Sequence, residues 1–146
     1  MITAVDTNVL IDVFAADPTF GRRSLEAVSQ CALEGRLVAT DVVWAELGAV
    51  FPAVDDASAA LRALAVDFSA VDRSTAEVAG SAWRSYRARG GSRTRLVADF
   101  LIGAHASLQG EALLTRDRGF YRDYFADLRV VDPARLPRST SPRSST

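Results

Sequence analysis

The stretch ITAVDTNVLIDVF, residues 2–14, places one carboxylate between two apolar segments. Ile2–Val5 has the short apolar run of a buried strand, and Val9–Phe14 has the apolar pattern of a helix. Asp6 stands at their junction, followed by two further polar residues. Because burying a charge is unfavourable unless the charge is paired or coordinated, the position of Asp6 calls for a chemical explanation.

The composition is that of one compact domain. The chain has 146 residues, 49% of them hydrophobic, with a mean hydropathy of +0.08. No apolar run approaches the roughly 18 residues that a membrane span needs, and the N-terminus lacks the pattern of a signal peptide. Cys31 is the single cysteine, so no internal disulfide can form. These features predict a soluble cytoplasmic protein.

Two residue types are scarce in a way that excludes several chemistries. The sequence contains no lysine, which rules out Schiff-base enzymes, P-loop nucleotide binding and receiver domains. His105 is the one histidine, so zinc sites built from several histidines are also excluded. The net charge of -1 and the pI of about 5.8 do not by themselves indicate a nucleic-acid-binding protein.

Strand and helix patterns alternate along the chain. Strands are predicted at Ile2–Val5, Leu37–Ala39, Val66–Val71, Ala112–Thr115 and Leu128–Val131. Helices are predicted at Asn8–Ala15, Phe20–Gly35, Val42–Phe51, Ala57–Ala65, Ser74–Arg89 and Leu96–Gln109. The alternation predicts an α/β fold with a central parallel sheet of about five strands and helices on both faces. The domain is expected to end near residue 133, and residues 134–146, rich in Pro, Ser, Thr and Arg, are expected to form a disordered tail.

Lone acids recur in apolar segments. Glu46 is the only charged residue in VVWAELGAVF (42–51), and Asp99 is the only one in LVADFLIGAHASLQ (96–109). Helices that are apolar on nearly every side are usually buried, so both acids are expected to be shielded from solvent. Asp6 and Asp117 each follow a predicted strand, at the sheet edge where ligands bind in parallel α/β folds. The small residues Gly103 and Ala106 are expected to leave room beside Asp99.

Acids gathered without a basic partner indicate a site for a hard divalent cation. Mg²⁺ and Mn²⁺ prefer oxygen ligands, which Asp6, Glu46, Asp99 and Asp117 would supply. Each acid also has an ordinary structural explanation. Asp6 could cap a helix, Glu46 could lie at an exposed helix edge, Asp99 could favour a helix dipole, and Asp117 could belong to a turn before Gly119.

The segments AVDTNVLIDVF, VVWAELGAVF, VADFLIGAHA and LLTRDRGFYRDYF resemble the PIN domain, and more narrowly the VapC-type ribonuclease toxins of bacterial toxin–antitoxin pairs. The resemblance runs from residue 1 to about residue 133. It implies that Asp6, Glu46, Asp99 and Asp117 are catalytic and bind metal, with Asn8 and Thr115 as supporting polar residues. It also implies a central first strand, dependence on Mg²⁺ or Mn²⁺, a homodimer, and inhibition by a cognate VapB-type antitoxin.

The chemistry expected from this resemblance is hydrolysis of RNA phosphodiesters by a metal-activated water. Arginines are the candidate RNA-binding residues, because guanidinium groups grip phosphates and stack on bases. The candidates are Arg87, Arg89, Arg93, Arg95, Arg116 and Arg118. Their alternative is ordinary solvated surface, with Arg116 and Arg118 pairing with Asp123 or Asp127.

Other phosphate-handling folds fit less well. A haloacid-dehalogenase-type phosphatase would need an aspartate where Asn8 stands, and a flavodoxin-like protein would need a phosphate-binding loop after the first strand. A serine hydrolase would need a G-x-S-x-G motif, which the sequence lacks. The alternative that stays open is a non-catalytic PIN-like domain that binds RNA or serves as a scaffold.

Overall fold

A five-stranded parallel sheet forms the centre of the molecule. The structure, a computed structural model, describes residues 1–92, 95 and 97–137. In this part of the chain the strands are β1 (Ile2–Val5), β2 (Arg36–Thr40), β3 (Val66–Ser69), β4 (Ala112–Leu114) and β5 (Arg129–Val131), in the order β3-β2-β1-β4-β5. Thr3 of β1 is in register with Leu37 on one side and Ala112 on the other, so the first strand is central. The predicted α/β class and parallel sheet are confirmed.

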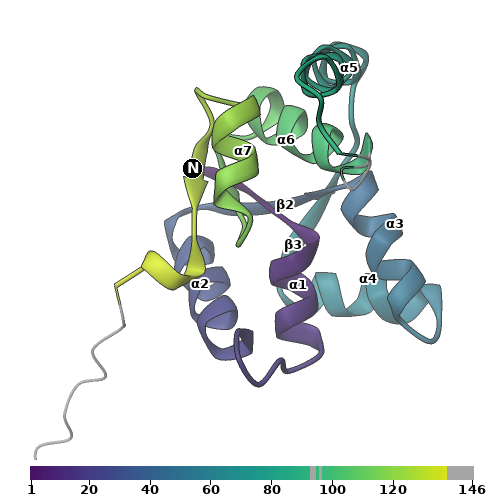
Figure 1. Cartoon of the computed structure of the whole chain (residues 1–146). Coiled ribbons are helices and arrows are strands. Elements are labelled where there is room, and N and C mark those ends of the chain that lie inside the picture. The colour runs from purple at the N-terminus through teal and green to yellow at the C-terminus, as the bar shows by residue number, and fades with distance from the viewer. Residues whose placement is uncertain (93–94, 96, 138–146) are drawn as a thin grey trace, which may run out of the picture.

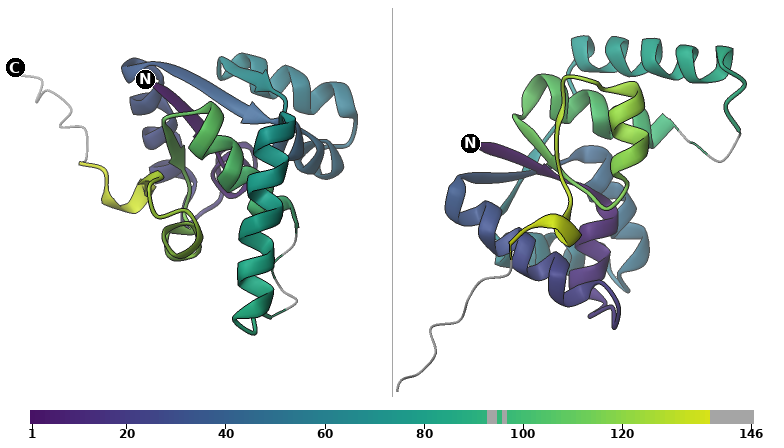
Figure 2. Two further views of the ribbon diagram at one scale, coloured as in Figure 1. Left: turned by 90° about the horizontal axis from the view of Figure 1, so that it is seen from above. Right: turned by 60° about the vertical axis from the view of Figure 1, so that its left-hand side comes forward.

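Helices cover both faces of this sheet (Figure 1). They are α1 (Thr7–Phe14), α2 (Gly21–Glu34), α3 (Asp41–Val50), α4 (Val54–Ala63), α5 (Arg73–Ala88), α6 (Val97–Gln109) and α7 (Arg118–Tyr124), with a 3-10 turn η1 (Pro133–Arg135). The chain adds β2 and β3 on one side of β1, then β4 and β5 on the other. Right-handed crossovers therefore place α1 to α4 on one face and α5 to α7 on the opposite face. In Figure 2, α5 projects beyond the rest of the domain.

Helix α7 is absent from the sequence-based prediction. It has only seven residues, too few to show a helical period, and three of them are aromatic. In the structure these aromatics join the core around Phe100 of α6, which is fully buried. The Phe100 ring packs edge-on against Phe120 of α7 and Tyr86 of α5, with ring centroids 5.3 and 5.5 Å apart. This cluster fixes α5, α6 and α7 to one another.

The small residues on α6 serve close packing. A Cβ atom built on Gly103 would lie 2.3 Å from the ring of Phe125, just after α7, and Ala106 is completely buried. The expectation that this face leaves open room beside Asp99 is therefore wrong. The glycine is needed because the Phe125 ring rests directly on the helix backbone.

The domain continues past the predicted boundary at residue 133. Asp132 caps η1 by accepting a hydrogen bond from the Ala134 amide, 3.0 Å long. Arg23 of α2 donates to the carbonyl oxygens of Ala134 and Leu136, each at 3.0 Å. The rest of the predicted tail, residues 138–146, lies outside the described residues. In the described part of the chain, no helix is both long and apolar enough to cross a membrane.

Candidate active site

The candidate site lies between β1 and β4, where the direction of strand addition reverses. Such a switch point opens a crevice at the carboxyl ends of the strands. Asp6 follows β1 directly, and Thr115 follows β4. The Asp6 amide donates to the Leu114 carbonyl at 2.9 Å, so the hydrogen bonding between β1 and β4 extends as far as Asp6.

Asp6 is the most completely buried acid of the predicted quartet, with 6% of its surface exposed. Its Oδ1 accepts the Thr7 amide at 2.7 Å, so Asp6 also caps α1. Its Oδ2 accepts three side-chain donors: the Thr115 hydroxyl at 2.7 Å, the Tyr121 hydroxyl at 3.2 Å and the Asn8 amide at 3.4 Å. Burial, with a smaller contribution from the charge of Asp99, raises the pKa of Asp6 to about 6 despite these hydrogen bonds.

Tyr121 lies within electrostatic reach of three of the acids. Its phenol is buried, and its pKa lies far above the usual value, first because of burial and then because of the charges of Asp6, Asp99 and Asp117. The sequence-based assignment missed this residue, because the run of aromatics from 120 to 125 resembles core packing. The only feature of the sequence that could have indicated a role for Tyr121 in the site is its hydroxyl group, four residues after Asp117.

Glu46 reaches the site from α3 through Thr7. The Thr7 hydroxyl donates to Glu46 Oε1 at 2.9 Å, and Thr7 is adjacent to Asp6. The expectation that Glu46 is shielded from solvent is wrong, because the residue is exposed. Helix α3 lies at the surface with Val43 and Leu47 as its fully buried residues, and its other apolar side chains stay partly or fully accessible.

Asp117 is neutralised by an arginine. A hydrogen-bonded ion pair joins Arg95 Nη1 to Asp117 Oδ2, and the Arg95 guanidinium lies 4.2 Å from the centre of the Phe120 ring. This hydrogen bond raises the pKa of Arg95, and the charge of Asp99 adds to the effect. The Asp117 amide donates to the Thr115 hydroxyl at 3.0 Å, which connects Asp117 to the partners of Asp6.

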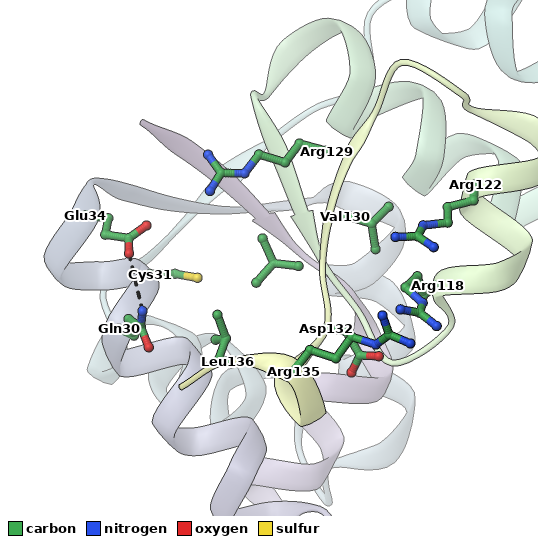
Figure 3. Close-up of a pocket in the computed structure, with 11 residues that line it drawn as sticks. Gln30, Cys31, Glu34, Arg118, Arg122, Arg129, Val130, Asp132, Arg135 and Leu136 are labelled. Atoms are coloured by element: carbon green, nitrogen blue, oxygen red, sulfur yellow. Dashed lines mark hydrogen bonds between the residues drawn. The ribbon is translucent and has the colours of Figure 1, made fainter. Parts of the chain in front are cut away.

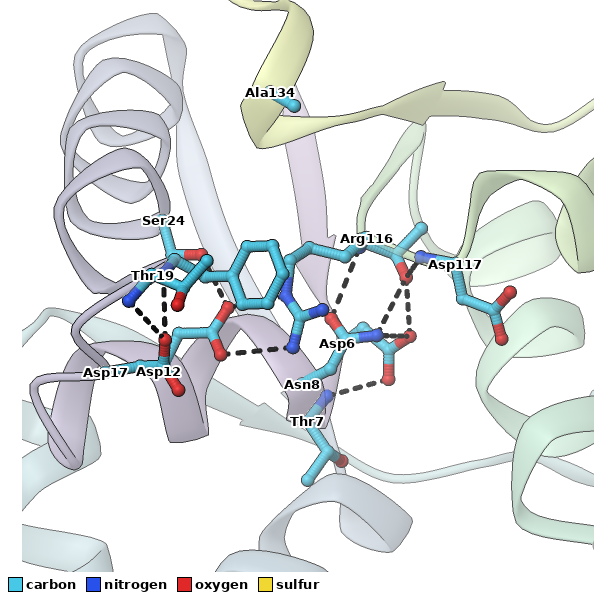
Figure 4. Close-up of polar contacts among 12 residues, drawn as sticks. Asp6, Thr7, Asn8, Asp12, Asp17, Thr19, Ser24, Arg116, Asp117 and Ala134 are labelled. Atoms are coloured by element: carbon cyan, nitrogen blue, oxygen red, sulfur yellow. Dashed lines mark hydrogen bonds and ion pairs between the residues drawn. The ribbon is translucent and has the colours of Figure 1, made fainter.

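Arg116 is committed to a second buried acid, Asp12, which the sequence-based assignment overlooked. Arg116 donates to both carboxylate oxygens of Asp12, at 2.7 and 3.1 Å, and the Ser24 hydroxyl donates to Asp12 at 2.8 Å. Figure 4 shows this pair beside the group formed by Asp6, Thr7 and Asn8. The Arg116 amide donates to Asn8 at 3.3 Å. Arg116 thus pairs with Asp12, where the sequence suggested Asp123 or Asp127.

The other candidate RNA-binding arginines are dispersed. Arg87 lies over the Trp83 ring and Arg89 over the Tyr124 ring, both exposed at the end of α5. Arg118 lines a separate pocket. Arg93 lies outside the described residues.

The donor atoms suit a hard cation. As they stand, the described residues contain no group of three or more His, Cys, Asp or Glu side chains that could hold a metal ion. The acids around Tyr121 nevertheless offer oxygen atoms alone, as Mg²⁺ and Mn²⁺ prefer. Asp6 Oδ1 accepts one hydrogen bond from the described residues and keeps a lone pair for a cation. Asp117 would have to exchange Arg95 for the ion.

Residues 3–125 match the PIN domain family. This chain belongs to that family. Solved structures with the same fold include VapBC2 from Rickettsia felis bound to a promoter DNA fragment, with a TM-score of 0.71 and 17% identity over 90% of this chain and 98% of that chain. VapBC-1 from nontypeable Haemophilus influenzae has a TM-score of 0.68 and 20% identity over 92% and 99%.

A third structure with this PIN fold is VapC20 from Mycobacterium tuberculosis, described as a Sarcin-Ricin loop cleaving toxin. It has a TM-score of 0.55 and 16% identity over 87% of this chain and 98% of that chain. At these identities the likeness concerns the fold. Among curated proteins no relative matches the chain significantly.

Proposed function

We propose that this PIN domain is a VapC-type toxin, a divalent-metal-dependent endoribonuclease that hydrolyses RNA phosphodiesters. The observation that carries the proposal is the buried Asp6 at the topological switch point, which accepts hydrogen bonds from Thr115 and Tyr121, while the charges of Asp99 and Asp117 act on Tyr121. A further support is that structures of the same fold include VapBC complexes and a toxin that cleaves the Sarcin-Ricin loop.

Asp6 and Asp99 would hold the Mg²⁺ or Mn²⁺ ion, with help from Asp117 and Glu46. When bound, the ion would supply Lewis acidity that activates a water molecule and neutralises charge on the phosphate. The chain's own residues would hold this arrangement in place. Thr115 and Tyr121 orient Asp6 by donating to its Oδ2, and Asp6 would offer the ion its Oδ1, which accepts the Thr7 amide.

The products follow from the nucleophile. If water attacks the phosphorus, the RNA 2′-hydroxyl takes no part, and cleavage leaves a 5′-phosphate and a 3′-hydroxyl. An attack by the 2′-hydroxyl would instead leave a cyclic phosphate. The end groups therefore test the proposed chemistry independently of sequence specificity.

The partners in this proposal are an RNA substrate, a cognate VapB-type antitoxin and a second copy of the chain, in the cytoplasm. Two of the similar structures are VapBC complexes, whose names join VapC to VapB. They support a VapB-type antitoxin as the partner. The homodimer rests on the family resemblance alone, and the cytoplasmic location rests on sequence features such as the single cysteine.

The test is cleavage of a total-RNA pool by antitoxin-free protein, with Mg²⁺, with Mn²⁺ and with EDTA, followed by mapping of the new ends. Asp99→Asn is the inactive variant, and Glu77→Gln, an exposed acid on α5, is the matched control. Discrete cuts that need both metal and Asp99, and that carry 5′-phosphates, are the expected result. Cuts that persist in EDTA or in Asp99→Asn would refute the mechanism.

One observation favours a second candidate, a PIN-like domain that binds RNA without cleaving it. The ion pair between Arg95 and Asp117 occupies one of the four acids. A domain of this kind would bind RNA with equal affinity in Mn²⁺ and EDTA and would produce no new ends in either condition.

A further inference from the structure

A second polar pocket lies along the outer edge of the sheet, beside β5. It has a volume of about 280 Å³ and is bordered by β5, η1, α2 and α7. Its charged lining residues are Arg118, Arg122, Arg129, Arg135, Glu34 and Asp132. Figure 3 shows the guanidinium groups of Arg118, Arg122 and Arg135, here called the arginine triad, gathered at one end, with Arg129 directed toward the other.

Of the described residues that line the pocket, Asp132 is the one acid beside the three guanidinium groups of the arginine triad, and its charge acts on Arg118. Within the described residues none of its members forms an ion pair, and Arg118 Nη1 is buried without a hydrogen-bond acceptor. Asp132, the acid beside the triad, already accepts the Ala134 amide as the cap of η1. Desolvation and the charges of Arg135 and Arg122 lower the pKa of Arg118, and the charge of Asp132 offsets only part of this effect. Guanidinium groups that lie close together, one of them with an N–H group that has no acceptor, are typical of a site that binds an anion.

We infer that the arginine triad binds a backbone phosphate of the RNA substrate, outside the acidic catalytic site. This inference rests on the proposed function in one respect, that RNA is the polymer bound. Guanidinium groups form paired hydrogen bonds with phosphate oxygens, and the several acceptor oxygens of one phosphate suit several guanidinium groups. The positive pocket also offsets the repulsion between the acids and a polyanion.

Helix α7 connects this pocket to the catalytic site. Arg118 and Arg122 are four residues apart and share one face of the helix, directed into the pocket. Tyr121 of the same helix donates to Asp6, and Asp117 immediately precedes it. A helix with its side chains is about 10–12 Å across, so one RNA strand can contact both sites. This continuity favours RNA over an acidic protein segment as the occupant.

The test is binding of a labelled single-stranded RNA oligonucleotide in EDTA, where the catalytic metal plays no part. The variants are the double substitution Arg122→Gln/Arg135→Gln, which removes exposed side chains only, and the triple substitution that adds Arg118→Gln. The control is Arg22→Gln/Arg73→Gln, which removes two exposed arginines elsewhere on the surface. Thermal unfolding verifies that each variant is folded.

We expect RNA affinity to fall about tenfold or more in the triple variant and by an intermediate factor in the double variant, with little change in the control. The slope of log affinity against log salt should fall in magnitude by about 0.7 for each phosphate that the variant no longer neutralises. Equal affinity in the triple variant and the control would overturn the inference, as would a failure of the wild type to bind RNA. Polyglutamate serves as a probe for the alternative occupant, an acidic protein segment. If the triple variant binds polyglutamate more weakly but binds RNA as the wild type does, the inference is also overturned.

This result is separable from the proposed nuclease activity. Loss of RNA binding in EDTA by the triple variant supports the inference even if the wild type cleaves nothing. Metal-dependent cleavage with an unchanged KM in the triple variant would support the nuclease and refute the phosphate site.

Discussion

At the scale of single residues, Asp6 shows how a residue proposed to be catalytic opposes stability. Its pKa of about 6, against an ordinary value of 3.8, means that folding favours the protonated acid. The folded state therefore binds more protons than the unfolded state between about pH 4 and pH 6, and stability falls as pH rises through this window. At about 1.4 kcal/mol for each pKa unit, the ionised carboxylate destabilises the metal-free fold by roughly 3 kcal/mol above pH 6.

Asp6→Asn should therefore stabilise the metal-free protein while removing its activity. We expect a gain of about 2 kcal/mol in the free energy of unfolding near pH 7.5, less than the full electrostatic term because the amide accepts fewer of the surrounding hydrogen bonds. Near pH 4 the gain should vanish. Urea unfolding in EDTA at the two pH values measures it. Asp123→Asn, an exposed acid on α7, should stay close to the wild type at both, and an equal gain at both pH values would contradict the assignment.

Arg116 illustrates the opposite case, a charge held for stability. Asp12 is 4% exposed, so Arg116→Met would leave a buried carboxylate without its cation. We expect a loss of about 3–5 kcal/mol, and a partial recovery when Asp12→Asn is added. Chemical denaturation of the single and double variants gives both values.

The matched control for Arg116→Met is Arg36→Met, at an ion pair whose side chains are 60% and 54% exposed. That substitution should change stability by less than about 1 kcal/mol. Equal effects at the two sites would show that Asp12 does not depend on Arg116.

Residue-level inference from sequence rested on charges that interrupt apolar runs. Asp6 and Asp99 stood out for this reason, and the structure brings them within electrostatic reach of each other. Asp12 also interrupts an apolar run, between Ile11 and Val13, and was overlooked. Tyr121 could not be identified, since a buried hydroxyl that donates to an acid has the same sequence pattern as a packed aromatic ring.

At the scale of elements, α6 shows how a helix sequence encodes a contact that sequence alone does not identify. Gly103 and Ala106 on this helix are small, and their size suggested an open face beside Asp99. The structure shows that the Phe125 ring fills the space. Helix periods are readable from sequence because they are local, whereas the partner of each face depends on how distant elements meet.

Two glycine-to-alanine substitutions distinguish the effect of helix propensity on stability from the effect of packing. Gly103→Ala should destabilise the fold by about 1–3 kcal/mol, because the added Cβ overlaps the Phe125 ring. Gly80→Ala in α5 has nothing within 4 Å of its new Cβ and should stabilise the fold by up to about 1 kcal/mol. Thermal unfolding of both variants tests the pair. A stabilising Gly103→Ala would mean that Phe125 does not rest on α6.

At the scale of the whole molecule, the strand order explains why the acids meet. Asp6 follows β1 and Asp117 follows β4, and these strands are neighbours at the switch point although more than a hundred residues separate them in the chain. The alternation of strands and helices predicted the parallel sheet, which was enough to place both acids at one edge. It could not predict that Arg95 pairs with Asp117, because that contact joins two loops.

That ion pair leads to a prediction about the stability of the whole domain. A ligand that binds only the folded state stabilises it, by about 2.7 kcal/mol at a hundred times its dissociation constant. We expect millimolar Mn²⁺ to raise the unfolding temperature of the wild type, and the rise to be lost in Asp99→Asn but kept in Glu77→Gln. Because Arg95 competes with the cation for Asp117, Arg95→Met should give the same rise at a lower Mn²⁺ concentration. Calorimetric titration provides the affinities; an Arg95→Met variant that binds Mn²⁺ more weakly than the wild type would show that Arg95 supports the site and does not oppose the metal.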